Sequence, residues 1–132
     1  MIRGQAFLNV PDKTARGNIR HLNVIITEPD SENNVLVVPV CTYREKDGKP
    51  LPWQDPSCRL PAGCHPFVND KSFVGYNNAR VMSLIDIING FNKGILVRQK
   101  EFEAKYVQDI QRGAEESLFL PEKFKRFFEF FL

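Results

Sequence analysis

The sequence predicts a mainly β domain that ends in helices, an α+β fold built as one domain. Apolar segments rich in valine, isoleucine and aromatic residues, separated by turn residues, fill positions 1–84. In the last third of the chain the apolar spacing changes to a helical period. The 132 residues are enough for one sizeable core. We therefore expect a single domain over 1–132, with a small, partly closed β-barrel body at 1–84 and a helical C-terminal extension at 85–132 packed on it.

The first half of the body contains three expected strands, QAFLNV, HLNVIIT and NVLVVPVCT. The turn-favouring segment EPDSENN between the second and third predicts an antiparallel hairpin. In VLVVPVCT both faces are apolar, which predicts a strand covered on both sides or a corner of a closed barrel. Pro39 cannot donate to a strand ladder, so it indicates an edge position or a bulge.

A long loop, REKDGKPLPWQDPSCRLPAGCHPFVNDK, follows these strands. Its proline and glycine content predicts an ordered loop of the kind that often carries function. Short strands are expected again at SFVGY and ARVMSL. LIDIINGFNKG is ambiguous between helix and strand, and we interpret it as a short helix that ends at Gly90 or Gly94.

Two helices are expected near the C-terminus. Apolar residues recur at helical spacing in EFEAKYVQDIQRG, and Gly113 is placed to end that helix. Pro121 is placed to begin the second, PEKFKRFFEFFL, whose phenylalanines form a stripe over 124–131. The polar face of this helix is mixed in charge, which favours packing on the barrel or on a partner over binding at a membrane surface.

Composition sets limits on location and partners. The chain is 42% hydrophobic and 26% charged, which is ordinary for a soluble globular protein, and no apolar run approaches the roughly 20 residues of a membrane helix. The N-terminal segment does not resemble a signal peptide, and an odd number of cysteines argues against a disulfide framework. We expect a cytoplasmic protein that does not bind a membrane. Walker, Rossmann, HExxH and EF-hand patterns do not occur, so no cofactor or metal is expected.

Basic residues lie in or beside the loops between positions 10 and 72. If these loops share one end of the fold, they form a basic rim; otherwise the charges only increase solubility. His21, Arg44 and Arg59 belong to these regions and are candidates for substrate binding. Trp53, in PLPWQDP, is the aromatic residue we expect to be exposed and able to stack on an unpaired base, whereas Phe67 and Phe73 are expected in the core.

Arg20 and Thr42 form the principal candidate pair. Arg20 precedes HLNVIIT, and Thr42 ends the next strand, so an antiparallel hairpin brings the two to the same edge of the sheet. A guanidinium suits bidentate contact with a phosphate, and a nearby hydroxyl can position the reacting group. The alternative from spacing alone is a surface arginine and a threonine that merely favours strands.

The loop also carries Cys58, Cys64 and His65. Their spacing is irregular for zinc, and a cysteine seldom points toward a histidine that follows it directly, so a metal or thiol site is a minor alternative. His65 alone is a candidate general acid or base, with a hydrogen-bonded loop histidine as the alternative.

The order of these features resembles the PemK/MazF-type toxins, plasmid-maintenance toxins with an SH3-like barrel. IRGQAFLNVP resembles their opening strand, and Arg20 before HLNVIIT and Thr42 at the end of NVLVVPVCT are similar to their paired catalytic positions. A branch of PemK-like sequences carries a loop similar to CRLPAGCHPFVNDKSFV. The resemblance covers about residues 2–84.

The resemblance implies a toxin of a type II toxin-antitoxin system, an endoribonuclease that cleaves single-stranded RNA without metal. The ribose 2′-hydroxyl attacks the adjacent phosphate, Arg20 stabilises the phosphate charge and takes part in proton transfer, and Thr42 positions the phosphate. Because a free arginine has a pKa above about 12, we expect its role to be mainly electrostatic and assign proton transfer to His65. The implied partners are single-stranded RNA, a cognate protein antitoxin and a second copy of the chain. The alternative function is a non-catalytic SH3-like barrel that binds a peptide or a nucleic acid.

Overall fold

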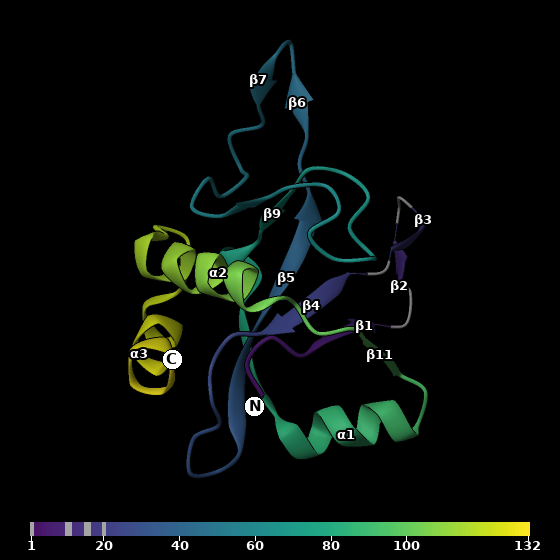
Figure 1. Ribbon diagram of the computed structural model, residues 1–132, viewed down its shortest axis with the longest axis vertical. Coiled ribbons are helices and arrows are strands. Elements are labelled where there is room, and N and C mark those ends of the chain that lie inside the picture. Colours follow the sequence, from purple (N-terminus) through teal and green to yellow (C-terminus); the bar gives the residue numbers. More distant parts are fainter. Residues whose placement is uncertain (1, 10–11, 15–16, 20) are drawn as a thin grey trace.

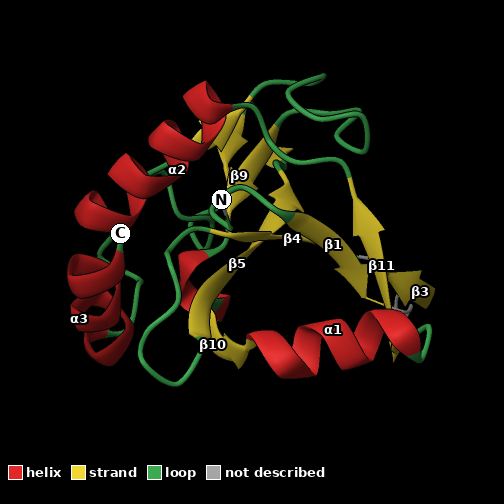
Figure 2. Ribbon diagram, turned by 60° about the horizontal axis from the view of Figure 1, so that its bottom comes forward, coloured by secondary structure: helices red, strands yellow, loops and turns green. Residues whose placement is uncertain are grey.

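The structure is a computed structural model that describes residues 2–9, 12–14, 17–19 and 21–132, and the side chains of residues 2–9 and 21–132. It has a mixed α+β fold, mostly antiparallel sheet with helices on both sides (Figures 1 and 2). The predicted class, mainly β with C-terminal helices, is confirmed at this level. None of the described helices combines the length and the apolar character needed to cross a membrane.

The main sheet contains, in spatial order, β11 (Leu96–Gln99), β1 (Ala6–Asn9), β4 (Leu22–Ile25), β5 (Asn34–Thr42), β9 (Ser72–Val74) and β8 (Arg59–Leu60), with β10 (Arg80–Ser83) beside β5. Two separate hairpins are formed by β2 (Asp12–Thr14) with β3 (Gly17–Ile19) and by β6 (Glu45–Lys46) with β7 (Lys49–Pro50). The helices are η1 (Tyr76–Asn78), α1 (Leu84–Asn92), α2 (Ala104–Glu116) and α3 (Glu122–Phe131). Among the described residues no strand pairing joins β11 to β8, the two ends of this path.

β5 is the strand on which the sheet is organised. Along one edge it pairs with β4, from Val37 to Val40, which confirms the predicted hairpin. Along the other edge its first part pairs with β10 and its last part, Val40–Thr42, pairs with β9. One long strand therefore holds both halves of the sheet, and its C-terminal end lies among β4, β9 and the loops that follow.

Alternation along β5 explains why both of its faces are apolar. Leu36 and Val38 face a large core that also contains residues of α2 and α3, such as Ile110 and Phe128. Val35 and Val37 face a second core with Ile87 of α1. Because successive side chains of a strand point to opposite faces, the two cores bury both faces of β5 from Val35 to Val40, as its sequence predicted, and leave its last residue, Thr42, exposed. Each fully buried aliphatic side chain contributes roughly 1.5–3 kcal/mol to folding.

The C-terminal third differs from the predicted helical extension in two respects. Leu96–Gln99 forms β11, which pairs with β1 and completes one edge of the sheet. α2 continues through Gly113 instead of ending there. A Cβ atom at this position would overlap the Tyr76 hydroxyl and lie 2.7 Å from the Cβ of Cys58, so this glycine permits close packing of the helix. α1 is confirmed as a short helix, and α3 begins directly after Pro121.

Candidate functional site

The β4–β5 hairpin brings the start of one strand beside the end of the other. Leu22 pairs with Val40, and Thr42 pairs in turn with Ser72 of β9. Arg20 lies outside the described residues, so its proposed contact with Thr42 stays a prediction. The described residues nonetheless place the end of β5 beside the start of β4 and next to the proline-rich loop, as the hairpin predicted.

A cavity of about 500 Å³ opens at this place, and we call it the strand-end cleft. Four predicted site residues line it: His21, Thr42, Arg44 and Trp53. Its remaining walls and floor are formed by Leu22, Val40, Cys41, Phe67, Val68, Asn69, Asp70, Ser72 and Asn78. The cleft thus joins a cation, a carboxylate, an imidazole, hydroxyls, amides and two aromatic rings over an apolar floor, a composition suited to a polar ligand with flat apolar parts.

Two of these polar groups are available to a ligand. The Thr42 side chain is exposed and makes no hydrogen bond to another described residue. The Arg44 side chain is also exposed, and no described carboxylate forms an ion pair with it. Since neither group has a partner within the described part of the chain, binding a ligand would break no internal contact at either.

Trp53 is held at the wall of the cleft by its neighbours in the loop. The indole is 53% exposed and meets Phe73 edge to face at 5.8 Å between ring centroids. The next residue, Gln54, is buried: its Oε1 accepts from the Arg44 amide at 2.7 Å, and its Nε2 donates to the Arg44 carbonyl at 2.8 Å. With these two hydrogen bonds the Gln54 side chain pairs with the Arg44 backbone as a neighbouring strand would. They fix both Arg44 and the turn that carries Trp53.

A second anchor ties this loop to the end of α2. The buried Asp55 carboxylate accepts from the Ser57 hydroxyl and from the Ser117 hydroxyl, the latter at 2.6 Å. Ser117 also accepts from the Phe119 and Leu120 amides, so the same hydroxyl organises the turn between α2 and α3. The exposed Trp53 therefore precedes two buried, hydrogen-bonded residues, and this fixes the loop that presents it.

His65 lies away from the strand-end cleft. Its ring is 2% exposed and stacks at 4.8 Å from the ring of Phe102. Nε2 lies 2.6 Å from the Lys100 carbonyl oxygen, to which it donates, and Nδ1 accepts from the Phe67 amide at 3.0 Å. Both nitrogens are thus used to fix the loop, as in the alternative considered from the sequence. This geometry gives no support to proton transfer by His65.

The three cysteines are poor candidates for nucleophiles. Burial raises the pKa of Cys41, which lines the cleft, to about 11 and that of Cys58 to about 12. Burial also raises the pKa of Cys64. Because the thiolate is the reactive form, these thiols are largely protonated and unreactive near neutral pH. Within the described ranges no group of three or more His, Cys, Asp or Glu side chains is arranged to hold a metal ion.

Arg59 also lies outside the cleft. Its guanidinium stacks on Tyr43 in a separate hollow that shares Ser72 with the cleft. Two of the predicted substrate-binding arginines therefore lie in neighbouring hollows, Arg44 in one and Arg59 in the other.

Sequence reasoning missed the part of the cleft formed by residues 67–72. Phe67 was expected in the core, but it is 39% exposed and lines the cleft with Asp70 and Ser72. The sequence did contain a signal for this part of the cleft. The segment VNDKS, which is mostly polar, ends at Ser72, the first residue of β9, and Ser72 pairs with Thr42. Phe73, by contrast, is buried as expected.

Comparison with known proteins adds no family to this geometry: no family model, curated protein or solved structure matches the chain.

Proposed function

We propose that the protein is an endoribonuclease that cleaves single-stranded RNA in the strand-end cleft, as a PemK/MazF-like toxin with an SH3-like barrel. The observation that carries the proposal is the convergence of Thr42, Arg44, His21 and Trp53 in one cavity beside the end of β5. These side chains supply a hydroxyl, a cation, a group that exchanges protons and a stacking surface.

The cleft suits unpaired bases. Exposed aromatic side chains stack on any base whose face is free, and each such contact contributes about 1–3 kcal/mol. Trp53 and Phe67 offer two such rings, and Asn69 and Asn78 offer amides that can hydrogen-bond to base edges. In a duplex the bases are stacked on each other and unavailable, so this arrangement favours single-stranded RNA.

The reaction we propose is transfer of the phosphate to the neighbouring 2′-oxygen. The 2′-oxygen forms a bond to phosphorus, the bond from phosphorus to the 5′-oxygen breaks, and the products carry a 2′,3′-cyclic phosphate and a 5′-hydroxyl. His21, which lines the cleft where His65 does not, accepts the proton of the 2′-hydroxyl on a ring nitrogen. The departing 5′-oxygen takes a proton from water or from the imidazolium.

The remaining polar groups stabilise charge on the phosphate. Thr42 donates a hydrogen bond to a non-bridging oxygen, and Arg44 binds a phosphate through its guanidinium. By the resemblance, Arg20 adds a second cation at the reacting phosphate. Developing charge in such a site is stabilised by donors that are already oriented, which commonly changes the rate by about 10²–10³ for a single group.

The barrel, the biological setting and the partners rest on the sequence resemblance. A long β5 that pairs with β4 along one edge and with β9 and β10 along the other is compatible with a small barrel whose strands bend between two sheets. In a cytoplasmic toxin-antitoxin pair, the antitoxin would lay a peptide across the cleft and compete with RNA. Formation of a homodimer is part of the same proposal.

The test is incubation of the purified protein with a long single-stranded RNA in EDTA, beside Thr42→Ala and Thr42→Ser. We expect discrete cuts by the wild type, loss of about 10²-fold or more in rate for Thr42→Ala, and partial retention for Thr42→Ser, which keeps the hydroxyl. If Thr42→Ala folds and cuts as fast as the wild type, the cleft is not the catalytic site. Binding without cleavage would favour the non-catalytic barrel.

A further inference from the structure

A second hollow lies beside the strand-end cleft, and no part of the proposed reaction uses it. It has a volume of about 360 Å³ and is lined by Tyr43, Arg59, Leu60, Lys71 and Ser72, among others. Ser72 also borders the strand-end cleft, so the two cavities adjoin. We call the second one the flanking hollow.

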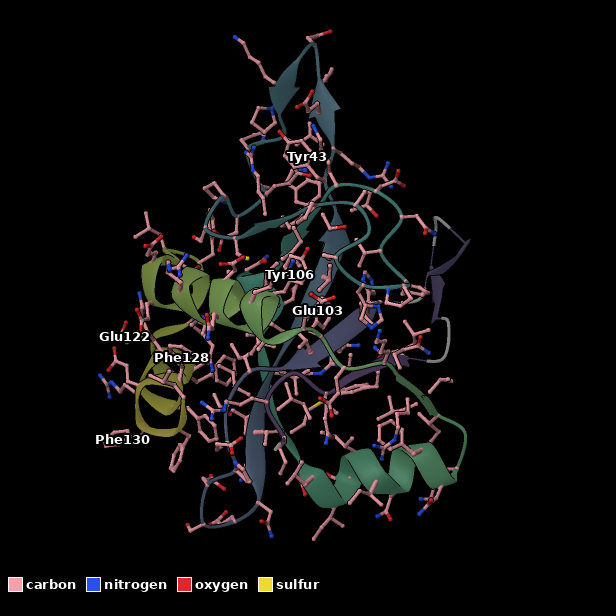
Figure 3. All side chains as sticks on the ribbon, in the orientation of Figure 1. Tyr43, Glu103, Tyr106, Glu122, Phe128 and Phe130 are labelled. Atoms are coloured by element: carbon pink, nitrogen blue, oxygen red, sulfur yellow. The ribbon has the colours of Figure 1, made fainter. Side chains whose placement is uncertain are left out.

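Three adjacent strands bring the residues of the flanking hollow together. The Tyr43 amide donates to the Lys71 carbonyl at 2.9 Å, which extends the pairing of β5 with β9 beyond Thr42. Arg59 enters from β8, whose pairing with β9 sets it opposite Phe73. Because successive residues of an extended chain point to opposite sides, Tyr43 and Thr42 face different cavities. Figure 3 shows Tyr43 at the base of the projecting β6–β7 hairpin.

The flanking hollow has a stacking platform and a net positive charge. The guanidinium carbon of Arg59 lies 4.6 Å from the centroid of the Tyr43 ring. The Tyr43 hydroxyl donates to Glu45 at 3.1 Å, which holds the ring in place. Within the described part of the chain, neither Arg59 nor Lys71 forms an ion pair with a carboxylate. Two cations thus meet one carboxylate, that of Glu45, around a planar stacked pair.

We propose that the flanking hollow binds a nucleotide of the RNA next to those held in the strand-end cleft. Its base stacks on the Arg59–Tyr43 pair, since planar guanidinium groups and aromatic rings both accept unpaired bases. Its phosphate is held by Lys71 and Arg59. This inference rests on the proposed function, which it deepens. The substrate is an extended RNA strand that reaches past the end of β5, and its affinity for the protein increases with its length.

The experiment compares a trinucleotide with an RNA of about a dozen nucleotides, a length within the range of extended single-strand sites. Binding is followed by the fluorescence of Trp53, the one tryptophan of the chain, and cleavage by KM and kcat. The variants are Arg59→Ala, Arg59→Lys, Tyr43→Ala and Tyr43→Phe. Arg126→Ala, which removes an exposed arginine of α3, is the matched control.

We expect Arg59→Ala and Tyr43→Ala each to weaken binding of the longer RNA about tenfold, with a matching increase in KM and an unchanged kcat. Binding of the trinucleotide stays unchanged. Tyr43→Phe, which keeps the ring but loses its hydrogen bond to Glu45, weakens binding less than Tyr43→Ala. Arg59→Lys, which keeps the charge without a planar group, is intermediate. Arg126→Ala has no effect on either RNA.

Three results would overturn the inference in different ways. If the wild type binds both RNAs and the four variants bind the longer one equally well, the flanking hollow carries no nucleotide while the proposed function stands. If the wild type binds neither RNA, both proposals fall together. If it binds no RNA but binds an acidic peptide, and Arg59→Ala abolishes that binding, the hollow serves a protein partner instead.

Discussion

Replacing Gln54 by alanine removes the two hydrogen bonds that its side chain makes to the backbone of Arg44. Gln54 is 6% exposed, and its amide meets the Arg44 amide and carbonyl at 2.7 and 2.8 Å. It also lies next to Trp53, so the variant tests whether the aromatic wall of the strand-end cleft depends on this buried anchor.

The size of the effect follows from these two contacts. A hydrogen bond within a protein contributes about 0.5–1.5 kcal/mol net, so two contribute about 2 kcal/mol. Arg44 is exposed, and its carbonyl also accepts from the Leu51 amide, so water can reach the freed groups and no deeper desolvation cost is added. We therefore predict a loss of about 1–3 kcal/mol in the free energy of unfolding.

Urea denaturation measures the loss in stability, and RNA titration measures the loss in binding. Freeing the turn allows Trp53 more conformations, and ordering it again on binding costs on the order of 1 kcal/mol per residue. We expect RNA affinity to fall about five- to tenfold, with Trp53 fluorescence shifted toward the value of an unfolded chain. Gln108→Ala, which removes an exposed glutamine from α2, is the matched control and should be within about 0.5 kcal/mol of the wild type.

Gln54→Glu sharpens the test, because a carboxylate can still accept from the Arg44 amide but cannot donate to the Arg44 carbonyl. It should be no more stable than Gln54→Ala at neutral pH. Stability and RNA affinity of Gln54→Ala equal to those of Gln108→Ala would refute the anchoring role assigned to Gln54.

Three further predictions concern other parts of the fold. Gly113→Ala should lower the free energy of unfolding by about 2 kcal/mol in urea denaturation, because the added Cβ would lie 2.7 Å from the Cβ of Cys58. This loss is expected although alanine favours a helix over glycine by about 1 kcal/mol. A gain in stability would contradict this packing. Asp70→Asn should bind RNA up to about fivefold more tightly at low salt, because it removes a negative charge from the cleft, and an unchanged Kd would count against phosphate binding there. Burial raises the pKa of Cys41 from 9.0 to about 11 in the folded state. The free energy of unfolding should therefore be independent of this thiol below pH 9 and should fall as the pH rises from 9 toward 11. A smaller alkaline loss of stability in Cys41→Ala would confirm the cause.

The sequence was sufficient to predict the elements that depend on local pattern. The polar segment EPDSENN between two apolar runs predicted the β4–β5 hairpin, and the pairing of Leu22 with Val40 confirms it. Apolar residues on both faces of β5 predicted cover on both sides. Helical spacing and Pro121 predicted α2 and α3. In each case the signal lies within the element or its turn.

The elements that were missed depend on partners distant in sequence. β11 forms because the outer edge of β1 is free to pair with it, and the sequence LVRQ does not reveal that edge. α2 continues through Gly113, where the helix packs closely against the hydroxyl of Tyr76, a residue distant in sequence. His65 is buried because it donates to the Lys100 carbonyl, a contact between residues 35 positions apart.

For the candidate site, chain order was informative and loop geometry was not. The hairpin predicted that Arg20 and Thr42 lie at one edge of the sheet. The structure confirms the hairpin and places His21 and Thr42 in one cleft, whereas Arg20 lies outside the described residues. Trp53 was expected to be exposed because of its proline-rich surroundings, and it is. The exposure of Phe67 and the anchoring by Gln54 arise from the path of a long loop, which composition does not determine.

The most direct test of cleavage by 2′-hydroxyl attack is to compare a short RNA with a DNA of the same sequence, in EDTA, while Trp53 fluorescence reports binding. We predict that the protein cuts the RNA to fragments that end in 2′,3′-cyclic phosphate and leaves the DNA intact. If the RNA stays uncut although Trp53 fluorescence shows that it is bound, the cleft binds RNA without cleaving it. If the RNA and the DNA are both cut, cleavage does not use the 2′-hydroxyl, and the proposed chemistry is wrong.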